Sequence, residues 1–173
     1  MNTKLNISQA TTVDELDGVR RLMRDFVTWH QTRHAQYRDL IDKYFDPEVF
    51  EVELANLPGY FSAPHGRLLI AKEGSQVIGC VALRDLGDST CEMKRMFVDP
   101  AHHGRGVGQA LGNRIIKDAG DIGYRLMRLD TGPLQNEAQG LYERLGFQRI
   151  EPYYPLEQDM RSWLVFMERN LET

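Results

Sequence analysis

The 173-residue chain is poor in cysteine and has no hydrophobic run that approaches the length of a membrane span. Its two cysteines, Cys80 and Cys91, fall on separate predicted strands and offer neither zinc-ligand spacing nor a disulfide framework, so we expect both to be small core residues. The N-terminal residues lack the apolar segment of a signal peptide. These absences predict a cytoplasmic protein with no metal site and no membrane partner.

Basic clusters are also scarce, being limited to Arg20-Arg21 and Lys94-Arg95, and the net charge is −4. Because phosphate backbones are bound by basic surfaces, we expect no nucleic-acid partner. The chain is 42% hydrophobic and 27% charged, which is ordinary for a soluble globular protein, and no repeat or interdomain linker interrupts it. We predict a single domain over residues 1–173. The oligomeric state stays open, with a homodimer among the alternatives.

The hydrophobic pattern predicts seven strands and four helices. Thr12 and Glu15 form a capping box before a helical stripe, and Pro47 opens a second, short helix. The strands are expected over residues 5–7, 67–72, 77–85, 90–98, 125–130, 147–150 and 163–167. The last two helices are expected after the glycines near residue 106 and over residues 135–145. This order predicts an α/β (α+β) fold with a mixed central sheet of about seven strands and helices on both faces.

The most informative stretch is His103-Gly104-Arg105-Gly106-Val107-Gly108, which lies between a predicted strand and a predicted helix. Glycines allow a ligand to approach the backbone closely, and the free N–H groups of a first helical turn attract phosphate oxygens. Arg105 would add a positive charge. The spacing matches neither a P-loop nor the dinucleotide fingerprint. The stretch therefore predicts either a diphosphate cradle of another kind or a plain glycine-rich turn.

Two later segments favour the cradle: Leu129-Asp130-Thr131, and the run from Leu141 to Phe147. With the strand before the glycine loop, they resemble the GNAT superfamily of acyl-CoA-dependent N-acetyltransferases, over residues 67–150 most clearly. The resemblance implies a GNAT-like domain in which acetyl-CoA is the acyl donor and the loop binds its pyrophosphate. His103 stands where the family has Gln or Arg. The residues expected to contact the coenzyme are Phe97, Val98, His103, Gly104, Arg105, Gly106, Val107, Gly108 and Asn136. Asn136 shares this expectation with its neighbour Gln135.

Acetyl transfer to an amine needs a neutral amine, a donor to the thioester oxygen and a proton for the leaving sulfur. The resemblance implies that a backbone N–H near Phe97 and Val98 donates to the oxygen, and that Tyr142 protonates the sulfur. Tyr142 also lies on an apolar helical stripe, so simple packing is its alternative role. Glu92 is the candidate base. An ion pair with Lys94 on the same strand face is an equal alternative.

The acceptor site is expected among the first helices and the last hairpin. These segments carry aromatic and acidic residues, namely Trp29, His30, His34, Tyr37, Tyr60, Phe61, Tyr153, Tyr154, Asp39, Asp42, Asp46 and Glu157. Aromatic walls with carboxylates suit a small cationic amine. His30 and His34 have the spacing of a metal pair without a third ligand, so they predict a polar helix face near this site.

We therefore predict an N-acetyltransferase that moves an acetyl group from acetyl-CoA to a primary amine of a small molecule, by direct attack in a ternary complex. A protein lysine or N-terminal amine is the alternative acceptor. The alternative function is a non-catalytic acyl-CoA-binding sensor or interaction module.

Overall fold

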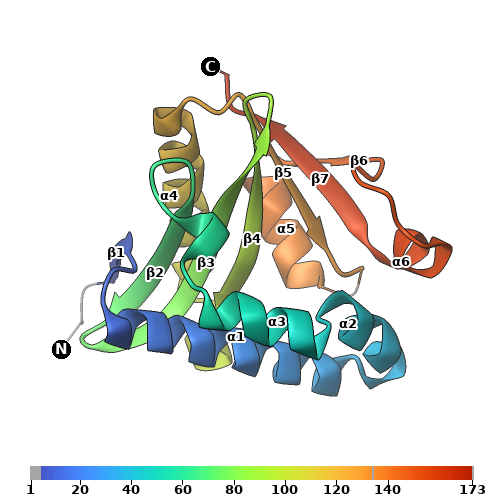
Figure 1. Ribbon diagram of the computed structural model, residues 1–173, viewed down its shortest axis with the longest axis horizontal. Helices are drawn as coiled ribbons and strands as arrows, with labels where there is room; N and C mark the ends of the chain where they lie inside the picture. The colour runs from blue at the N-terminus through green and yellow to red at the C-terminus, as the bar shows by residue number, and fades with distance from the viewer. Residues whose placement is uncertain (1–4, 134, 173) are drawn as a thin grey trace.

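The computed structural model describes residues 5–133 and 135–172 and contains one seven-stranded sheet (Figure 1). Its strands are β1 (Asn6–Gln9), β2 (Arg67–Glu73), β3 (Gln76–Gly87), β4 (Thr90–Val98), β5 (Leu126–Thr131), β6 (Gln148–Ile150) and β7 (Val165–Asn170). The α-helices are α1 (Val13–Arg33), α2 (Arg38–Tyr44), α3 (Pro47–Ala55), α4 (Val107–Ile122), α5 (Asn136–Arg144) and α6 (Gln158–Trp163). Short 3-10 helices at Ala35–Tyr37, Gly59–Phe61 and Pro100–His102 complete the described chain.

The strand order is β1-β2-β3-β4-β5-β7-β6, and β4 and β5 are the parallel pair within an otherwise antiparallel sheet. These two strands pair only from Thr90 to Glu92 on β4 and from Leu126 to Arg128 on β5. Both strands continue further, β4 to Val98 and β5 to Thr131. Beyond Glu92 and Arg128, the described residues of β4 and β5 do not pair with each other through the backbone. The sheet is therefore open between the later halves of β4 and β5.

Two hydrophobic cores lie on the two faces of the sheet. Residues of α1, α2, α3 and α6 pack against one face, and residues of α4 and α5 pack against the other. In Figure 1, α1, α2 and α3 lie along the bottom of the view in blue to teal, and the central strands extend upward from them. The predicted mixed sheet of about seven strands with helices on both faces is confirmed.

Local sequence signals account for most element boundaries. Thr12 and Glu15 form the predicted capping box at the start of α1, with Thr12 Oγ1 accepting from the Glu15 N–H at 3.2 Å. Cys80 and Cys91 are buried on β3 and β4, as predicted. The prediction that the last strand begins at Trp163 is wrong, because Trp163 ends α6 and β7 begins at Val165. Helices as short as α6 show little periodicity.

None of the helices in the described part of the chain combines the length and the apolar character needed to cross a membrane.

Candidate active site

The glycine loop shapes the start of α4. Gly104 and Gly106 have positive φ values of 74° and 78°, which side-chain-bearing residues rarely adopt. Gly106 is the N-cap residue of α4, and within the described residues it provides no side-chain cap for the first turn. A Cβ atom at Gly104 or Gly106 would meet nothing within 4 Å, so the loop borders open space. Backbone N–H groups at the positive end of α4 are thus available to an anion.

Gly108 has a different role, which is helix packing. A Cβ atom there would lie 3.1 Å from Cδ2 of Leu141 on α5. Its missing side chain therefore lets α4 approach α5 closely, in the layer that forms one wall of the site.

A cleft of about 550 Å³, here called the main cleft, runs from the glycine loop along the end of β4 to α5. This volume falls in the range of small-molecule and cofactor sites. The cleft wall also includes Phe26 and Trp29 of α1. Eight of the nine residues expected to contact the coenzyme line it together: Phe97, Val98, His103, Gly104, Gly106, Val107, Gly108 and Asn136.

Arg105 is the ninth residue, and it is not part of the described cleft wall. Its guanidinium pairs with both carboxylate oxygens of Glu73 at the end of β2, with Nη1 at 3.3 Å from Oε2. Its positive charge is thus directed toward β2 and is largely neutralised there. His103, by contrast, stays at the cleft, where its Nε2 lies 2.8 Å from the Val98 carbonyl oxygen.

The two neighbouring amide side chains at the start of α5 differ in their hydrogen bonds. Gln135 accepts from the Thr131 hydroxyl at 2.7 Å, and its amide nitrogen lies 3.1 Å from Nε2 of His30. The Asn136 side chain has no hydrogen-bond partner among the described residues and lines the main cleft. Asn136 is therefore the amide that remains available to a ligand.

The backbone at the end of β4 faces the opening in the sheet. The Asp99 N–H donates to the Ile78 carbonyl on β3 at 2.9 Å. Since successive residues of a strand present their N–H and C=O groups to opposite sides, the Val98 groups face away from β3. A bulge precedes this point, where Arg95 adopts a φ of 55° and the β3–β4 register shifts. The Val98 carbonyl on this edge contacts His103, so the Val98 N–H is the backbone group that can bind an extended ligand.

Tyr142 lies at the inner end of this opening, on α5. Its side chain is 6% exposed and lines a small central pocket with Met93, Asp130 and Gln135. Its hydroxyl has no hydrogen-bond partner within the described parts of the chain. Burial, with a smaller effect of the Asp130 charge, raises the pKa of Tyr142 above its usual range. A protonated hydroxyl is therefore available in this central pocket.

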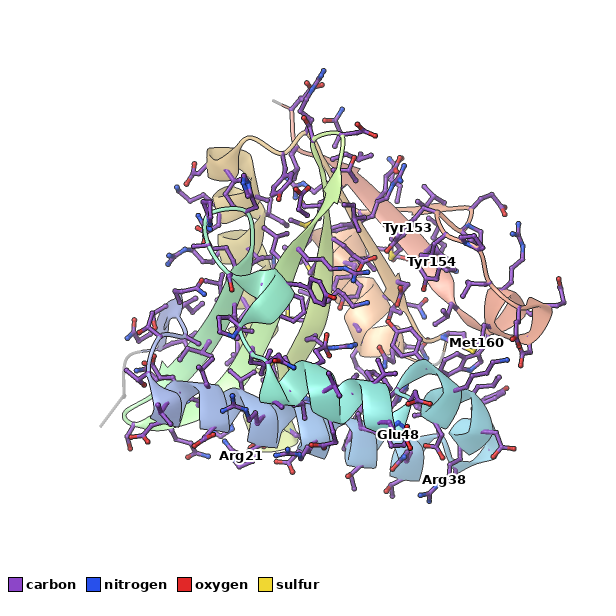
Figure 2. The ribbon with its side chains drawn as sticks, in the orientation of Figure 1. Arg21, Arg38, Glu48, Tyr153, Tyr154 and Met160 are labelled. Atoms are coloured by element: carbon purple, nitrogen blue, oxygen red, sulfur yellow. The ribbon has the colours of Figure 1, made fainter. Side chains whose placement is uncertain are left out.

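A second large cavity of about 680 Å³, here called the outer pocket, lies beyond the central pocket. Its lining includes Tyr44, Arg84, Glu92, Lys94, Arg128 and Tyr153. Figure 2 shows Tyr153 and Tyr154 on the segment after β6, and Met160 on α6 further along the same wall. The central pocket shares Phe26, Met96 and Gln135 with the main cleft, and Tyr44, Lys94 and Arg95 with the outer pocket. The central pocket thus shares wall residues with both cavities.

Glu92 is buried beneath the outer pocket, with 1% of its side chain exposed. Its Oε1 lies 2.9 Å from Arg84 Nε and 3.3 Å from Lys94 Nζ, and its Oε2 accepts from the Tyr153 hydroxyl at 2.7 Å. Burial alone would raise the pKa of Glu92. The charges of Lys94 and Arg84 and the hydrogen bond from Tyr153 outweigh burial, so its pKa lies below its usual range. The predicted contact between Glu92 and Lys94 is thus present.

His30 and His34 do not form the polar helix face that their spacing predicted. Their side chains are buried, and the ring centroids are 4.9 Å apart. Burial is the main cause that lowers the pKa of His30 to about 4, and it lowers the pKa of His34 as well. Both rings are therefore uncharged at neutral pH. No group of potential metal ligands occurs among the residues of known placement.

The predicted combination of aromatic walls and carboxylates is only half correct. Of the predicted aromatic residues, Tyr153 and Tyr154 do line the outer pocket, together with Tyr44, which was not predicted. Asp42 accepts from Gln31 and Asp46 caps α3, so both are engaged away from the outer pocket, whereas Glu157 lines the outer pocket but pairs with Lys43 there. Asp39 is exposed on α2 and does not line the outer pocket. The carboxylates therefore do not gather around one cavity.

Comparison with known proteins identifies the family. The model of the acetyltransferase (GNAT) family matches residues 26–147, which is more than half of the chain. The chain belongs to the GNAT acetyltransferase family. It is 40% identical over 154 residues to an uncharacterized N-acetyltransferase of Schizosaccharomyces pombe, covering 88% of both chains. It is 34% identical over 120 residues to an N-acetylaspartate synthetase of Danio rerio, covering 68% of this chain and 42% of that protein.

Solved structures of GNAT proteins share the fold. A GNAT acetyltransferase of Staphylococcus aureus has a TM-score of 0.74 at 20% identity, covering 98% of this chain and 100% of that chain. The PaiA N-acetyltransferase of Thermoplasma acidophilum, solved in complex with coenzyme A, has a TM-score of 0.72 at 16% identity, covering 96% and 99%. The GNAT-like fold predicted from the sequence is confirmed, and the protein is an acyltransferase enzyme.

Several residues of this GNAT site escaped the sequence analysis. Arg84 and Arg128 were not among the candidates, although they share the outer pocket with Glu92. Asp130 was noted only as part of a motif, yet it accepts hydrogen bonds from Tyr44 and, at 2.8 Å, from Tyr154. A polar residue within an otherwise apolar strand is the one signal that would have drawn attention to them.

Proposed function

We propose that the protein transfers an acetyl group from acetyl-CoA to the primary amine of a small molecule, by direct attack in a ternary complex. The observation that carries this proposal is a set of three neighbouring cavities. The main cleft and the outer pocket each share wall residues with the central pocket, which Tyr142 lines. Two substrates that occupy the main cleft and the outer pocket could therefore meet at the central pocket.

The residues present fit a coenzyme in the main cleft. The N–H groups that follow Gly104 and Gly106 suit a diphosphate, because an uncapped helix start offers several donors with favourable dipole alignment. The edge of β4 at Phe97 and Val98 suits the extended arm of the coenzyme. The Asn136 amide lines the same cleft. Arg105 would contribute only after release from Glu73.

Two groups of the chain then act on the thioester. A backbone N–H near Phe97 and Val98 donates to the thioester oxygen as it gains negative charge. Tyr142 donates its proton to the leaving sulfur as the acyl carbon–sulfur bond breaks and the carbon–nitrogen bond forms. The high pKa of Tyr142 keeps that proton in place until then. Because a thiol of pKa near 8.5 is already a fair leaving group, this proton accelerates the reaction without being indispensable.

The amine must lose its own proton before it attacks. At pH 7, neutralising a lysine-like amine of pKa about 10.4 costs about 4.6 kcal/mol, whereas an α-amine of pKa near 8 costs about 1.4 kcal/mol. Glu92 is a weak base for this step, because its carboxylate already accepts from Arg84, Lys94 and Tyr153. We therefore assign Glu92 the second of its two predicted roles, an ion-pair partner that orders these side chains.

Replacement Glu92→Gln tests this assignment. The change leaves Arg84 and Lys94 sharing a neutral amide, so the free energy of unfolding should fall by about 2 kcal/mol. The pH profile of kcat/KM should keep its shape, because no essential base is lost. Urea unfolding and pH–rate profiles are the measurements. Glu51→Gln in the exposed pair with Arg24 is the matched control and should change the stability much less than Glu92→Gln. Loss of the acidic limb of the profile would instead make Glu92 the base.

A thiol-release assay with acetyl-CoA tests the function itself. Polyamines, amino acids, aminoglycosides and lysine-containing peptides form the acceptor panel, scored by kcat/KM. We expect release that depends on a small amine and yields its N-acetyl product. Coenzyme binding without turnover on any amine would favour the sensor or interaction module. A clear preference for peptides or whole proteins would favour a protein acceptor, which is the kind named for a structural neighbour, the ribosomal-protein-S18-alanine N-acetyltransferase of Escherichia coli.

A further inference from the structure

Three basic side chains on adjacent strands line the outer pocket. In the sheet register, Arg84 of β3 lies opposite Glu92 of β4, which lies opposite Arg128 of β5. Lys94 follows Glu92 by two residues on β4 and therefore shares its face of the sheet. All four residues line the outer pocket. The floor of the pocket is thus a row of cations around one carboxylate.

The single carboxylate of Glu92 does not balance its neighbours. Arg84 and Lys94 both contact its Oε1, so two positive charges share one negative charge. Arg84 uses only its Nε in this contact. Its two terminal nitrogens have no partner among the described residues, and 37% of the side chain is exposed. Arg84 therefore presents unused donors to the pocket.

Arg128 presents a second set of donors from the opposite side of Glu92. Its Nε donates to Glu168 Oε2 on β7 at 3.1 Å, and its guanidinium lies 5.3 Å from the centre of the Tyr153 ring. Its terminal nitrogens have no partner in the described structure, and the side chain is 32% exposed. Tyr153 contacts both Glu92 and Arg128, because its hydroxyl donates to the Glu92 carboxylate and its ring lies against the Arg128 guanidinium.

The other charges around the outer pocket lie in ion pairs. Arg95 contacts Glu53, and Lys43 contacts both Glu157 and Asp159, so one negative charge is in excess at Lys43. Asp130, two residues after Arg128, holds the Tyr44 and Tyr154 hydroxyls and lines the central pocket beside Tyr142. The negative charge of Asp130 thus lies next to Tyr142. The surplus positive charge of Arg84 and Lys94 lies further out, in the outer pocket. Residues two apart on a strand are about 6.6 Å apart.

We infer that the acceptor is a small amine that also carries a carboxylate, as amino acids do, and that Arg84, Lys94 and Arg128 bind this carboxylate. The inference rests on the proposed acetyl transfer and names its substrate class. Arginine binds carboxylates through two parallel hydrogen bonds, and both arginines have the terminal nitrogens for this. A bound carboxylate would also neutralise the surplus charge, and it would leave the amine near Asp130 and Tyr142. The aromatic and acidic residues predicted a small cationic amine, but the carboxylates of this pocket are already paired and do not favour an acceptor that lacks a carboxylate.

The test compares matched acceptors that differ only in the carboxylate. For each of several α-amino acids, kcat/KM is measured beside the methyl ester and the decarboxylated amine. We expect the free acid to be preferred at least tenfold. Arg84→Gln should remove most of this preference, mainly by raising KM for the acid, while kcat/KM for the ester changes little. Arg84→Lys keeps the charge without the paired donors, so it should give an intermediate loss.

Controls separate binding from folding. Arg125→Gln alters an arginine that is 68% exposed, paired with Glu172 and outside the outer pocket, so it should preserve the preference. Arg128→Gln provides a second pocket variant if Arg84→Gln lowers the thermal midpoint. Equal or better rates with the decarboxylated amines would overturn the inference while leaving acetyl transfer intact.

A binding measurement distinguishes failure of the inference from failure of the proposed function. Calorimetric titration with an N-acetyl amino acid, in the presence of coenzyme A, reports on the pocket without turnover. We expect binding that weakens at least tenfold in Arg84→Gln and in Arg128→Gln. Such binding without any acetyl transfer would refute only the proposed reaction. Binding that is unaffected by both variants would refute the carboxylate site.

Discussion

Replacement of Gly106 by valine is expected to weaken coenzyme A binding by about 100-fold, with the fold retained. Gly106 caps α4 with a φ of 78°, a conformation that costs a β-branched residue about 1–3 kcal/mol. The loop would relieve this strain by rotating its backbone. The first N–H groups of α4 would then no longer converge on the diphosphate. Calorimetric titration with coenzyme A measures the loss.

Two further variants show whether the backbone conformation is the cause. A Cβ atom at Gly106 meets nothing within 4 Å in the protein, so a steric clash within the protein is not the expected cause. Asparagine tolerates this left-handed conformation, so Gly106→Asn should bind the coenzyme much better than Gly106→Val. Gly120→Val, further along α4 and also facing open space, should leave binding unchanged. Full binding by a folded Gly106→Val variant would refute the cradle.

The glycine loop was predictable because its signal is local. Only glycine readily supplies the positive φ values at positions 104 and 106, and the apolar repeat that follows is typical of a helix packed on a sheet. The capping box at Thr12 and Glu15 is local in the same sense, since both residues lie within one helical turn. Backbone chemistry over a few residues therefore located the main cleft and the start of α1.

Contacts between distant segments could not be predicted in this way. Arg105 was assigned to the ligand, yet its guanidinium pairs with Glu73, which is 32 residues earlier and on another strand. The row of Arg84, Glu92 and Arg128 exists only because of the strand register, and a shift of one residue would place the side chains on opposite faces. Strand register depends on the whole sheet, so the sequence alone could not predict which charged side chains meet in the outer pocket.

The sequence left two interpretations open for Tyr142. Its position before Leu145-Gly146-Phe147 suggested an acid, and its apolar stripe suggested packing. The structure shows a side chain that packs against Phe147 at a ring separation of 6.0 Å and also lines the central pocket. Packing and function are therefore compatible, and only a measurement on the hydroxyl can tell whether it acts in the reaction.

The replacement Tyr142→Phe is that measurement, because it keeps the ring and removes the proton. We expect kcat to fall by about 100-fold, the lower range for general acid catalysis, with little change in the KM for acetyl-CoA. The thermal midpoint should stay close to that of the parent, since the Tyr142 hydroxyl makes no hydrogen bond within the described residues. Tyr60→Phe, at a side chain that is 80% exposed, is the matched control and should not alter kcat.

The pH dependence of the parent enzyme gives an independent check on Tyr142. Burial and the Asp130 charge raise the pKa of the Tyr142 hydroxyl, so it stays protonated throughout the range up to about pH 10, where an ordinary tyrosine begins to ionise. We therefore expect no fall in kcat between about pH 7 and pH 10 from loss of the acid. Single-turnover kinetics must first show that chemistry limits the rate. If chemistry is limiting and Tyr142→Phe retains the parental kcat, Tyr142 is a packing residue and the proton comes from elsewhere.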